Sequence, residues 1–94
     1  MINKDYFKQT RILDGGMGQE LLARGMKPNS TLWSANAILD ENYHQLVLDT
    51  HIDFIEAGAE IIVTTTFATR HRRLKENNLL DKFEYLNHKA GEIA

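Results

Sequence analysis

The sequence predicts an α/β fold of about two βα units, because short apolar runs alternate with amphipathic segments along the chain. Two runs have the character of buried strands: residues 11–14, which end at a pair of glycines, and the β-branched run of residues 61–67. Segments with helical spacing follow both runs, and another precedes the second. In this order the two strands are expected to run parallel, with their carboxyl ends at one edge.

The first unit begins after a polar lead-in over residues 1–10. The apolar run of residues 11–14 stops at Gly15 and Gly16, which is the pattern of a buried strand meeting a turn. Residues 17–25 then change to helical spacing, so the turn is expected to join a strand to a helix.

Charge and glycine placement support this first helix. Glu20 and Arg24 are four residues apart in the favourable order, with the acid nearer the N-terminus. Gly25 follows them at the place where a glycine commonly ends a helix. We therefore expect the helix to end at this glycine.

A long connection over residues 26–42 separates the first helix from the next one. It contains the only proline of the chain, Pro28, and the only tryptophan, Trp33. Ser34 is placed to cap a short helical turn over residues 35–39. Connections of this length usually have a function, but an ordinary excursion with Trp33 as its apolar anchor is an equally good interpretation.

Residues 43–57 show the clearest helical pattern in the chain. Asn42 is its expected N-cap and Gly58 its expected terminator. The apolar positions repeat at intervals of four and three residues: Leu48, Ile52 and Ile55, flanked by Val47 and Phe54. This stripe is expected to face the core.

The second unit consists of the strand at residues 61–67, a polar and basic turn at residues 68–78, and a helix at residues 79–94. One face of that helix is apolar, with Phe83, Leu86, Ala90 and Ile93. Two parallel strands with helices on one side would leave two open edges. We therefore expect residues 1–94 to be an incomplete part of a larger domain, with exposed strand edges through which copies could associate.

Composition excludes several classes of protein. The apolar and charged shares, 43% and 26% of the 94 residues, are ordinary for a globular domain, and the net charge of −2 does not suggest a partner nucleic acid. No apolar run is long enough to span a membrane, and the polar N-terminus lacks a secretion signal, so a cytoplasmic location is expected. The chain has no cysteine, which excludes disulfides and a thiolate metal site within it.

Asp14, Gly15 and Gly16 are the first candidate binding residues, because they lie where a predicted strand ends and a helix begins. Active sites of parallel α/β folds lie at this end of the strands. The glycines would let a ligand approach backbone N–H groups, and Asp14 could receive an ammonium group. On spacing alone, a plain glycine turn in which Asp14 caps the helix is the more common outcome.

The second strand is expected to end on the same edge. Thr64 and Thr66 would point to one face of it and could bind a carboxylate, with Phe67 as an apolar wall. Threonines in a strand are more often simple β-formers, and this alternative stays open.

Three further patterns give weaker indications. A dinucleotide site at Gly16 and Gly18 would need a third glycine at position 21, where Leu21 stands. The histidines lack metal-ligand spacing, and His51 is expected to be hydrogen-bonded at the edge of the core. The basic run of residues 70–75 is best interpreted as a solvated helix start, and less readily as a contact for an anionic donor such as a folate tail.

Taken in order, these segments resemble the homocysteine S-methyltransferase family. The resemblance covers residues 11–69 well and the remainder loosely. It rests on residues 12–21 (ILDGGMGQEL), Arg24-Gly25, residues 32–35 (LWSA), residues 51–60 (HIDFIEAGAE) and residues 61–67 (IIVTTTF). Two departures are small: Gln19 stands where threonine is common, and Asn42-Tyr43 where a proline often opens the helix.

The resemblance implies a (β/α)₈ barrel, of which this chain would supply the N-terminal part with the first two strands. It also implies transfer of a methyl group to the homocysteine thiol to give methionine, with a zinc-bound thiolate as the nucleophile. The family's zinc is held by three cysteines, none of which is in this chain, so the 94 residues alone are expected to be inactive. The methyl donor stays open among S-methylmethionine, S-adenosylmethionine, betaine and methyltetrahydrofolate.

The resemblance also implies roles for site residues. Asp14, Gly15 and Gly16 would hold the amino-acid end of homocysteine, with assistance from Thr64. Trp33, Ser34 and Phe67 would line the pocket. Two alternatives stand beside this prediction: a non-catalytic fragment stabilised by self-association, and an unrelated enzyme that shares the Asp-Gly-Gly turn.

Overall fold

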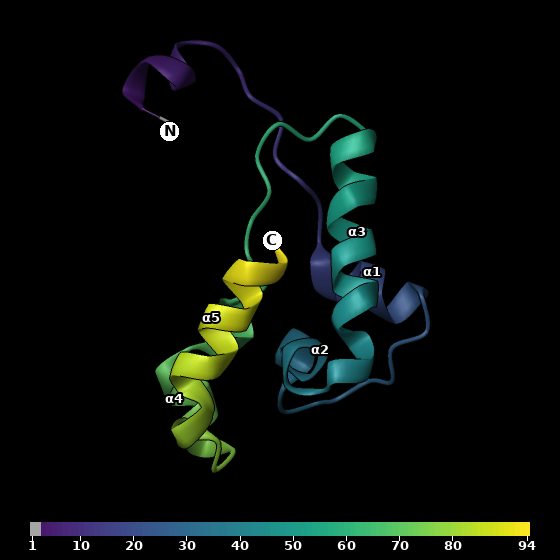
Figure 1. Cartoon of the computed structure of the whole chain (residues 1–94), viewed down its shortest axis with the longest axis vertical. Helices are drawn as coiled ribbons and strands as arrows, with labels where there is room; N and C mark the ends of the chain where they lie inside the picture. Colours follow the sequence, from purple (N-terminus) through teal and green to yellow (C-terminus); the bar gives the residue numbers. More distant parts are fainter. Residues whose placement is uncertain (1–2) are drawn as a thin grey trace.

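A computed structural model describes residues 3–94, so Met1 and Ile2 of the predicted lead-in lie outside the described residues. The described part is an elongated assembly of helices, 42 × 28 × 19 Å (Figure 1). Its α-helices are α1 (Met17–Ala23), α2 (Asn36–Leu39), α3 (His44–Glu56), α4 (His71–Glu76) and α5 (Phe83–Ile93). Short 3₁₀ turns occur at η1 (Lys4–Lys8), η2 (Trp33–Ala35), η3 (Glu41–Tyr43), η4 (Phe67–Thr69) and η5 (Leu80–Lys82).

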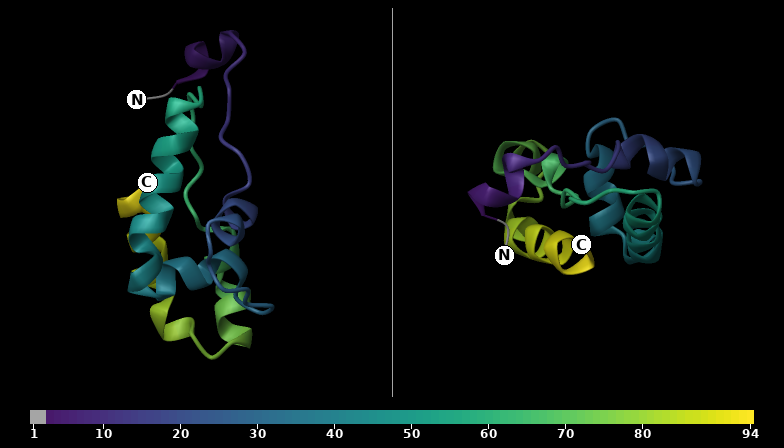
Figure 2. Two further views of the ribbon diagram at one scale, coloured as in Figure 1. Left: turned by 90° about the vertical axis from the view of Figure 1, so that its right-hand side faces the viewer. Right: turned by 90° about the horizontal axis from the view of Figure 1, so that it is seen from above.

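The predicted α/β class, as the N-terminal part of a (β/α)₈ barrel, is wrong for this chain. Residues 3–94 contain helices and no sheet, and the two predicted strands meet only at an isolated parallel bridge between Leu13 and Ile61. Around the bridge, the N–H groups of Asp14 and Ile61 donate to the carbonyls of Ile61 and Ile12, at 3.0 and 3.2 Å. The arm before the bridge and the segment after α3 lie side by side there (Figure 2).

The ladder stops because the second run bends and finds other hydrogen-bond partners. The N–H of Val63 donates to the side chain of Asp14 at 3.0 Å, where a strand would use a backbone carbonyl. The N–H of Thr66 donates to the carbonyl of Thr64 at 2.8 Å, which folds the chain back on itself. Two parallel strands without neighbours are marginal, so these local bonds replace the predicted strand at residues 61–67.

The predicted helices form, with corrections at their ends. The ion pair of α1 is present, with Glu20 Oε1 and Arg24 Nε 3.0 Å apart, and Gly25 (φ 105°) lies in the left-handed region. Gly58 ends α3 in the same way, at φ 118°. Asn42 does not cap α3, because the N-cap position belongs to Tyr43. The N–H of Asn42 donates to Asp40 at 3.0 Å.

Two loops also differ from expectation. The polar stretch after the second run forms the helix α4 where a turn was predicted. The short helix in the long connection is present as η2 and α2, but Ser34 makes no capping hydrogen bond to it.

The core lies where α1, α2 and α3 meet α4 and α5. Its fully buried large apolar side chains are Leu21, Ile38, Val47, Leu74 and Leu86. The predicted apolar face of α5 is confirmed, because Phe83 and Ile93 pack against this cluster and Leu86 and Ala90 belong to it.

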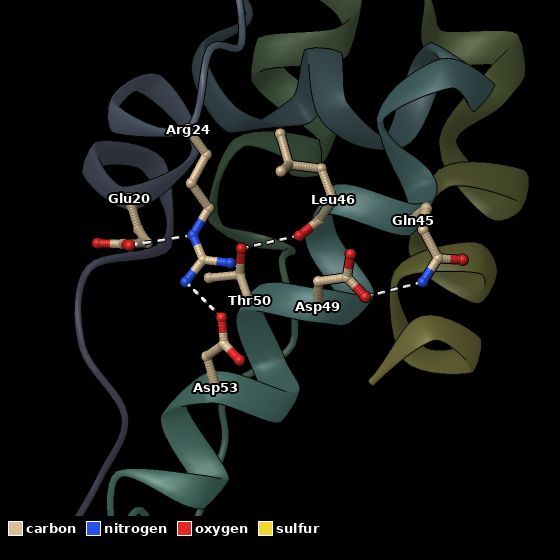
Figure 3. A network of polar contacts seen from close by, with 7 residues as sticks. All are labelled: Glu20, Arg24, Gln45, Leu46, Asp49, Thr50 and Asp53. Carbon is tan, nitrogen blue, oxygen red and sulfur yellow. Dashed lines mark hydrogen bonds and ion pairs between the residues drawn. The ribbon is translucent and has the colours of Figure 1, made fainter.

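The predicted stripe of α3 does not face the core. Leu48, Ile52 and Ile55 are 36, 41 and 51% exposed. Of the flanking positions Val47 is buried as predicted, and the rest of the buried face carries Thr50 and His51. Arg24 helps to fix this orientation, because its guanidinium joins Glu20 of α1 to Asp53 of α3, the latter at 2.8 Å (Figure 3). These carboxylates raise the pKa of Arg24, so the link stays charged.

Candidate substrate-binding site

One cavity of about 610 Å³ brings together seven of the residues that the sequence singled out as candidates for substrate binding, whereas Thr66, the partner predicted for Thr64, is not in its lining. Four segments supply them: the turn between the bridge and α1, the 3₁₀ turn η2, the bent second run, and η4. The predicted residues in its lining are Asp14, Gly15, Gly16, Trp33, Ser34, Thr64 and Phe67. A volume of this size lies within the range of small-molecule sites in proteins.

Asp14 is half-buried at the start of this cavity and ties two of its walls together. Its Oδ2 accepts a hydrogen bond from the N–H of Val63, at 3.0 Å. Among residues 3–94 this is the hydrogen bond that its carboxylate makes, and it leaves Oδ1 for a ligand. The side chain therefore does not cap α1, whose N-cap position is occupied by Gly16 without a side-chain bond.

The two glycines have different reasons to lack a side chain. A Cβ on Gly15 would lie 2.9 Å from Cε1 of Phe54, so the close approach of α3 requires glycine. A Cβ on Gly16 would meet nothing within 4 Å. Neither glycine needs a positive φ, and within residues 3–94 neither donates its N–H to a backbone carbonyl. The open space and free N–H at Gly16 leave room for a ligand.

Two of the three threonines of the second run, Thr64 and Thr65, line the cavity. The hydroxyls of Thr64 and Thr66 are 3.0 Å apart and hydrogen-bonded, as expected for side chains on one face. Thr65 also lines the cavity, and its buried hydroxyl has no partner within the described residues. Sequence reasoning missed Thr65 because a regular strand would have turned it to the opposite face.

The two aromatic side chains of the cavity are exposed to solvent, and one of them belongs to a residue with a strained backbone. Phe67 and Trp33 are both exposed at its rim. Trp33 has φ 51°, a conformation that bulky residues seldom adopt. Strain of this kind persists only where the surrounding structure imposes it, and it tends to occur at functional positions.

Two arginines of the basic run also line the cavity, contrary to the favoured interpretation of that run as a solvated helix start. The guanidinium of Arg70 lies over the ring of Phe67, 4.8 Å from its centroid. Arg73 contacts the long connection that follows α1, where its Nη1 donates to the carbonyl of Thr31 at 2.8 Å. Arg72 follows the expected behaviour, exposed to solvent and paired with Glu76.

His51 lies in the buried face of α3, near enough to Asp14 to be affected by its charge. It is 1% exposed, and neither ring nitrogen has a hydrogen-bond partner within residues 3–94, so the predicted hydrogen-bonded histidine is wrong. Burial lowers the pKa of His51, and the nearby charge of Asp14 opposes this only in part. The imidazole is therefore kept neutral.

The residues of this chain do not fit the zinc site that the resemblance implies. The sequence contains no cysteine. Residues 3–94 also contain no group of three or more His, Cys, Asp or Glu side chains that could hold a metal ion. Within the same residues, no helix is long and apolar enough to cross a membrane.

Comparisons with known proteins identify the family of this chain. A family model described as homocysteine S-methyltransferase matches residues 11–94. Homocysteine S-methyltransferase 2 of Saccharomyces cerevisiae is 32% identical over 93% of this chain and 29% of its own length. Homocysteine S-methyltransferase 2 of Zea mays is 43% identical over 88% of this chain and 24% of its own.

A third relative, selenocysteine Se-methyltransferase of Brassica oleracea var. italica, is 36% identical over 97% of this chain and 27% of its own length. The chain thus spans 24 to 29% of the length of these relatives. No solved structure matches it.

Proposed function

Since this chain belongs to the homocysteine S-methyltransferase family, we propose that its cavity binds the amino-acid end of L-homocysteine. The whole protein would transfer a methyl group to the homocysteine thiol and release methionine. One observation carries the proposal: seven residues, spread from position 14 to position 67, line a single cavity.

Asp14 is assigned to the ammonium group of the substrate. Its carboxylate is half-buried, and one oxygen is already held by the N–H of Val63, so the other is oriented without further ordering. A charged group fixed in this way binds a cation with less entropic cost than a mobile surface carboxylate. The free N–H groups of Gly15 and Gly16 are assigned to the substrate carboxylate.

The other lining residues shape the pocket for the rest of the substrate. Thr64 offers a hydroxyl, and it can donate to the ligand while it accepts from Thr66. Ser34 also lines the cavity, while Phe67 and Trp33 give an apolar surface for the thiol-bearing end. In the transfer itself, the thiolate sulfur attacks the methyl carbon, and the donor leaves with the electron pair of the broken bond.

This chain's part in that reaction is to bind and orient homocysteine. Its residues do not fit zinc. Catalysis by the whole protein is therefore a proposal that rests on the family, whereas homocysteine binding rests on the cavity.

Replacement of Asp14 by asparagine tests the binding proposal. Asparagine keeps an oxygen that can accept from the N–H of Val63, so the fold should be retained while the charge is lost. We expect the dissociation constant of L-homocysteine, measured by isothermal titration calorimetry, to rise about tenfold or more, equivalent to about 1.4 kcal/mol.

The matched control is Asp49→Asn. Asp49 is an exposed acid on α3 that accepts from Gln45 at 2.8 Å (Figure 3). It does not line the cavity. Its loss should leave the affinity unchanged. Equal affinities of the Asp14→Asn variant and the wild type would contradict the proposal.

A further inference from the structure

Arg70 and Arg73 give the cavity a positively charged wall. They are three residues apart, so their side chains extend from the same face at the start of α4. Neither is in an ion pair within residues 3–94. Glu76, the carboxylate beside them, already accepts from Nε of Arg72 at 3.1 Å. The two cations therefore repel each other without a compensating anion.

The side chain of Arg73 has one N–H group with an acceptor and another, buried N–H group without one. Its Nη1 donates to the carbonyl of Thr31 at 2.8 Å, which fixes the guanidinium at the edge of the cavity. Its Nε is buried and has no partner within the described residues. A buried charged N–H without an acceptor is costly, and such groups in native proteins usually have a partner.

Arg70 is held by stacking instead of a hydrogen bond: its guanidinium lies over the ring of Phe67, 4.8 Å from the ring centroid. Stacking uses the face of the guanidinium and leaves its edge N–H groups free. The edge of a guanidinium matches the two oxygens of a carboxylate. Asp14, on a different segment of the lining, gives the same cavity an acidic group.

From these observations we infer that Arg70 and Arg73 form a subsite for a carboxylate, and that this carboxylate belongs to the second substrate, the methyl donor. The inference rests on the proposed function, in which Asp14 and the glycines hold the amino-acid end of homocysteine. A cavity of about 610 Å³ is larger than one small amino acid requires, so both substrates can share it. Methyl donors without a carboxylate would be disfavoured.

Binding of four carboxylate-bearing donors to the chain tests this subsite: S-methyl-L-methionine, S-adenosylmethionine, glycine betaine and methyltetrahydrofolate. We expect at least one to bind the wild type in the presence of L-homocysteine. Arg70→Gln and Arg73→Gln should each weaken that donor about tenfold or more, with little change in homocysteine affinity. The side chain of Arg70 makes no hydrogen bond to the protein within residues 3–94, so its variant should keep the fold even if Arg73→Gln does not.

Arg72→Gln is the matched control, because Arg72 belongs to the same helix but does not line the cavity. It should change neither affinity. The inference is overturned if no donor binds while homocysteine does, or if the Arg70 variant binds the donor normally. It is also overturned if the arginine variants weaken homocysteine alone, since the carboxylate would then belong to the acceptor. Loss of homocysteine binding in the wild type would instead refute the proposed function.

Discussion

Asp14 connects the local structure of this chain to its proposed chemistry. Its backbone N–H pairs with Ile61 at the bridge, and its side chain accepts from Val63 two residues further on. Both bonds hold the second run against the first turn, where the cavity opens. A substitution that removed the acceptor as well as the charge would therefore disturb the fold, which is why asparagine is the informative variant.

The two glycines of the turn should respond differently to alanine. In Gly15→Ala the new methyl would overlap the ring of Phe54, and overpacking of this kind costs about 1–3 kcal/mol. Gly16→Ala meets only open space, so its stability should stay within about 0.5 kcal/mol of the wild type. Because that space belongs to the cavity, homocysteine affinity should nevertheless fall about tenfold, or about 1.4 kcal/mol.

Urea unfolding together with calorimetric titration would measure both effects. A Gly16→Ala variant that is stable and binds normally would show that the ligand does not approach this turn. A Gly15→Ala variant of normal stability would show that Phe54 does not lie against it.

Single residues of the site could be predicted where a local motif carried them. The Asp-Gly-Gly turn could be singled out because it follows an apolar run directly, and the resemblance favoured binding over the plain turn that spacing alone made more common. Thr65 was missed, and the contact role of the basic run was disfavoured, because these side-chain directions depend on the bend at Thr65 and on the turn η4 after it, which no spacing encodes. His51 was misjudged for a related reason, since its helix face could be assigned only once the packing of α3 was known.

At the scale of elements, helices were predictable and strands were not. A helix satisfies its hydrogen bonds within itself, so the patterns of α1, α3 and α5 were sufficient to identify them. A strand needs a neighbour, and the β-branched run after α3 has one partner residue at the bridge. The resemblance to a barrel family therefore gave the wrong architecture for these residues, although it gave the right family.

The exposed stripe of α3 gives a direct test of which face of this helix packs against the core. Ile55→Ala should cost less than about 1 kcal/mol, because the side chain is 51% exposed. Leu86→Ala, at a fully buried position of α5, should cost about 2–5 kcal/mol. Thermal or urea unfolding of both variants measures the difference. Equal costs would mean that the stripe is covered in solution.

At the scale of the whole molecule, the predicted self-association has to be restated. The expected open strand edges are absent from residues 3–94, but the segments around the bridge expose the apolar side chains of Ile12, Leu13 and Val63. Adjacent apolar side chains of this kind favour contact with a second copy. We predict a mass that rises with concentration in sedimentation equilibrium.

Ile12→Lys should reduce this association, because it places a charge in the exposed apolar segment. Ile52→Lys is the control variant, because Ile52 is exposed on α3 and not in the segments around the bridge. A wild type that stays monomeric at all concentrations would refute the predicted association and would leave the cavity proposal unaffected.

The central claim, that homocysteine binds at the Asp14 cavity, is tested most directly by following the amide signals of the ¹⁵N-labelled chain during titration with L-homocysteine. The claim predicts saturable shifts at Gly15, Gly16 and Thr64, with small changes along α5, which does not line the cavity. Saturable shifts confined to α5, or no shifts at all, would contradict it.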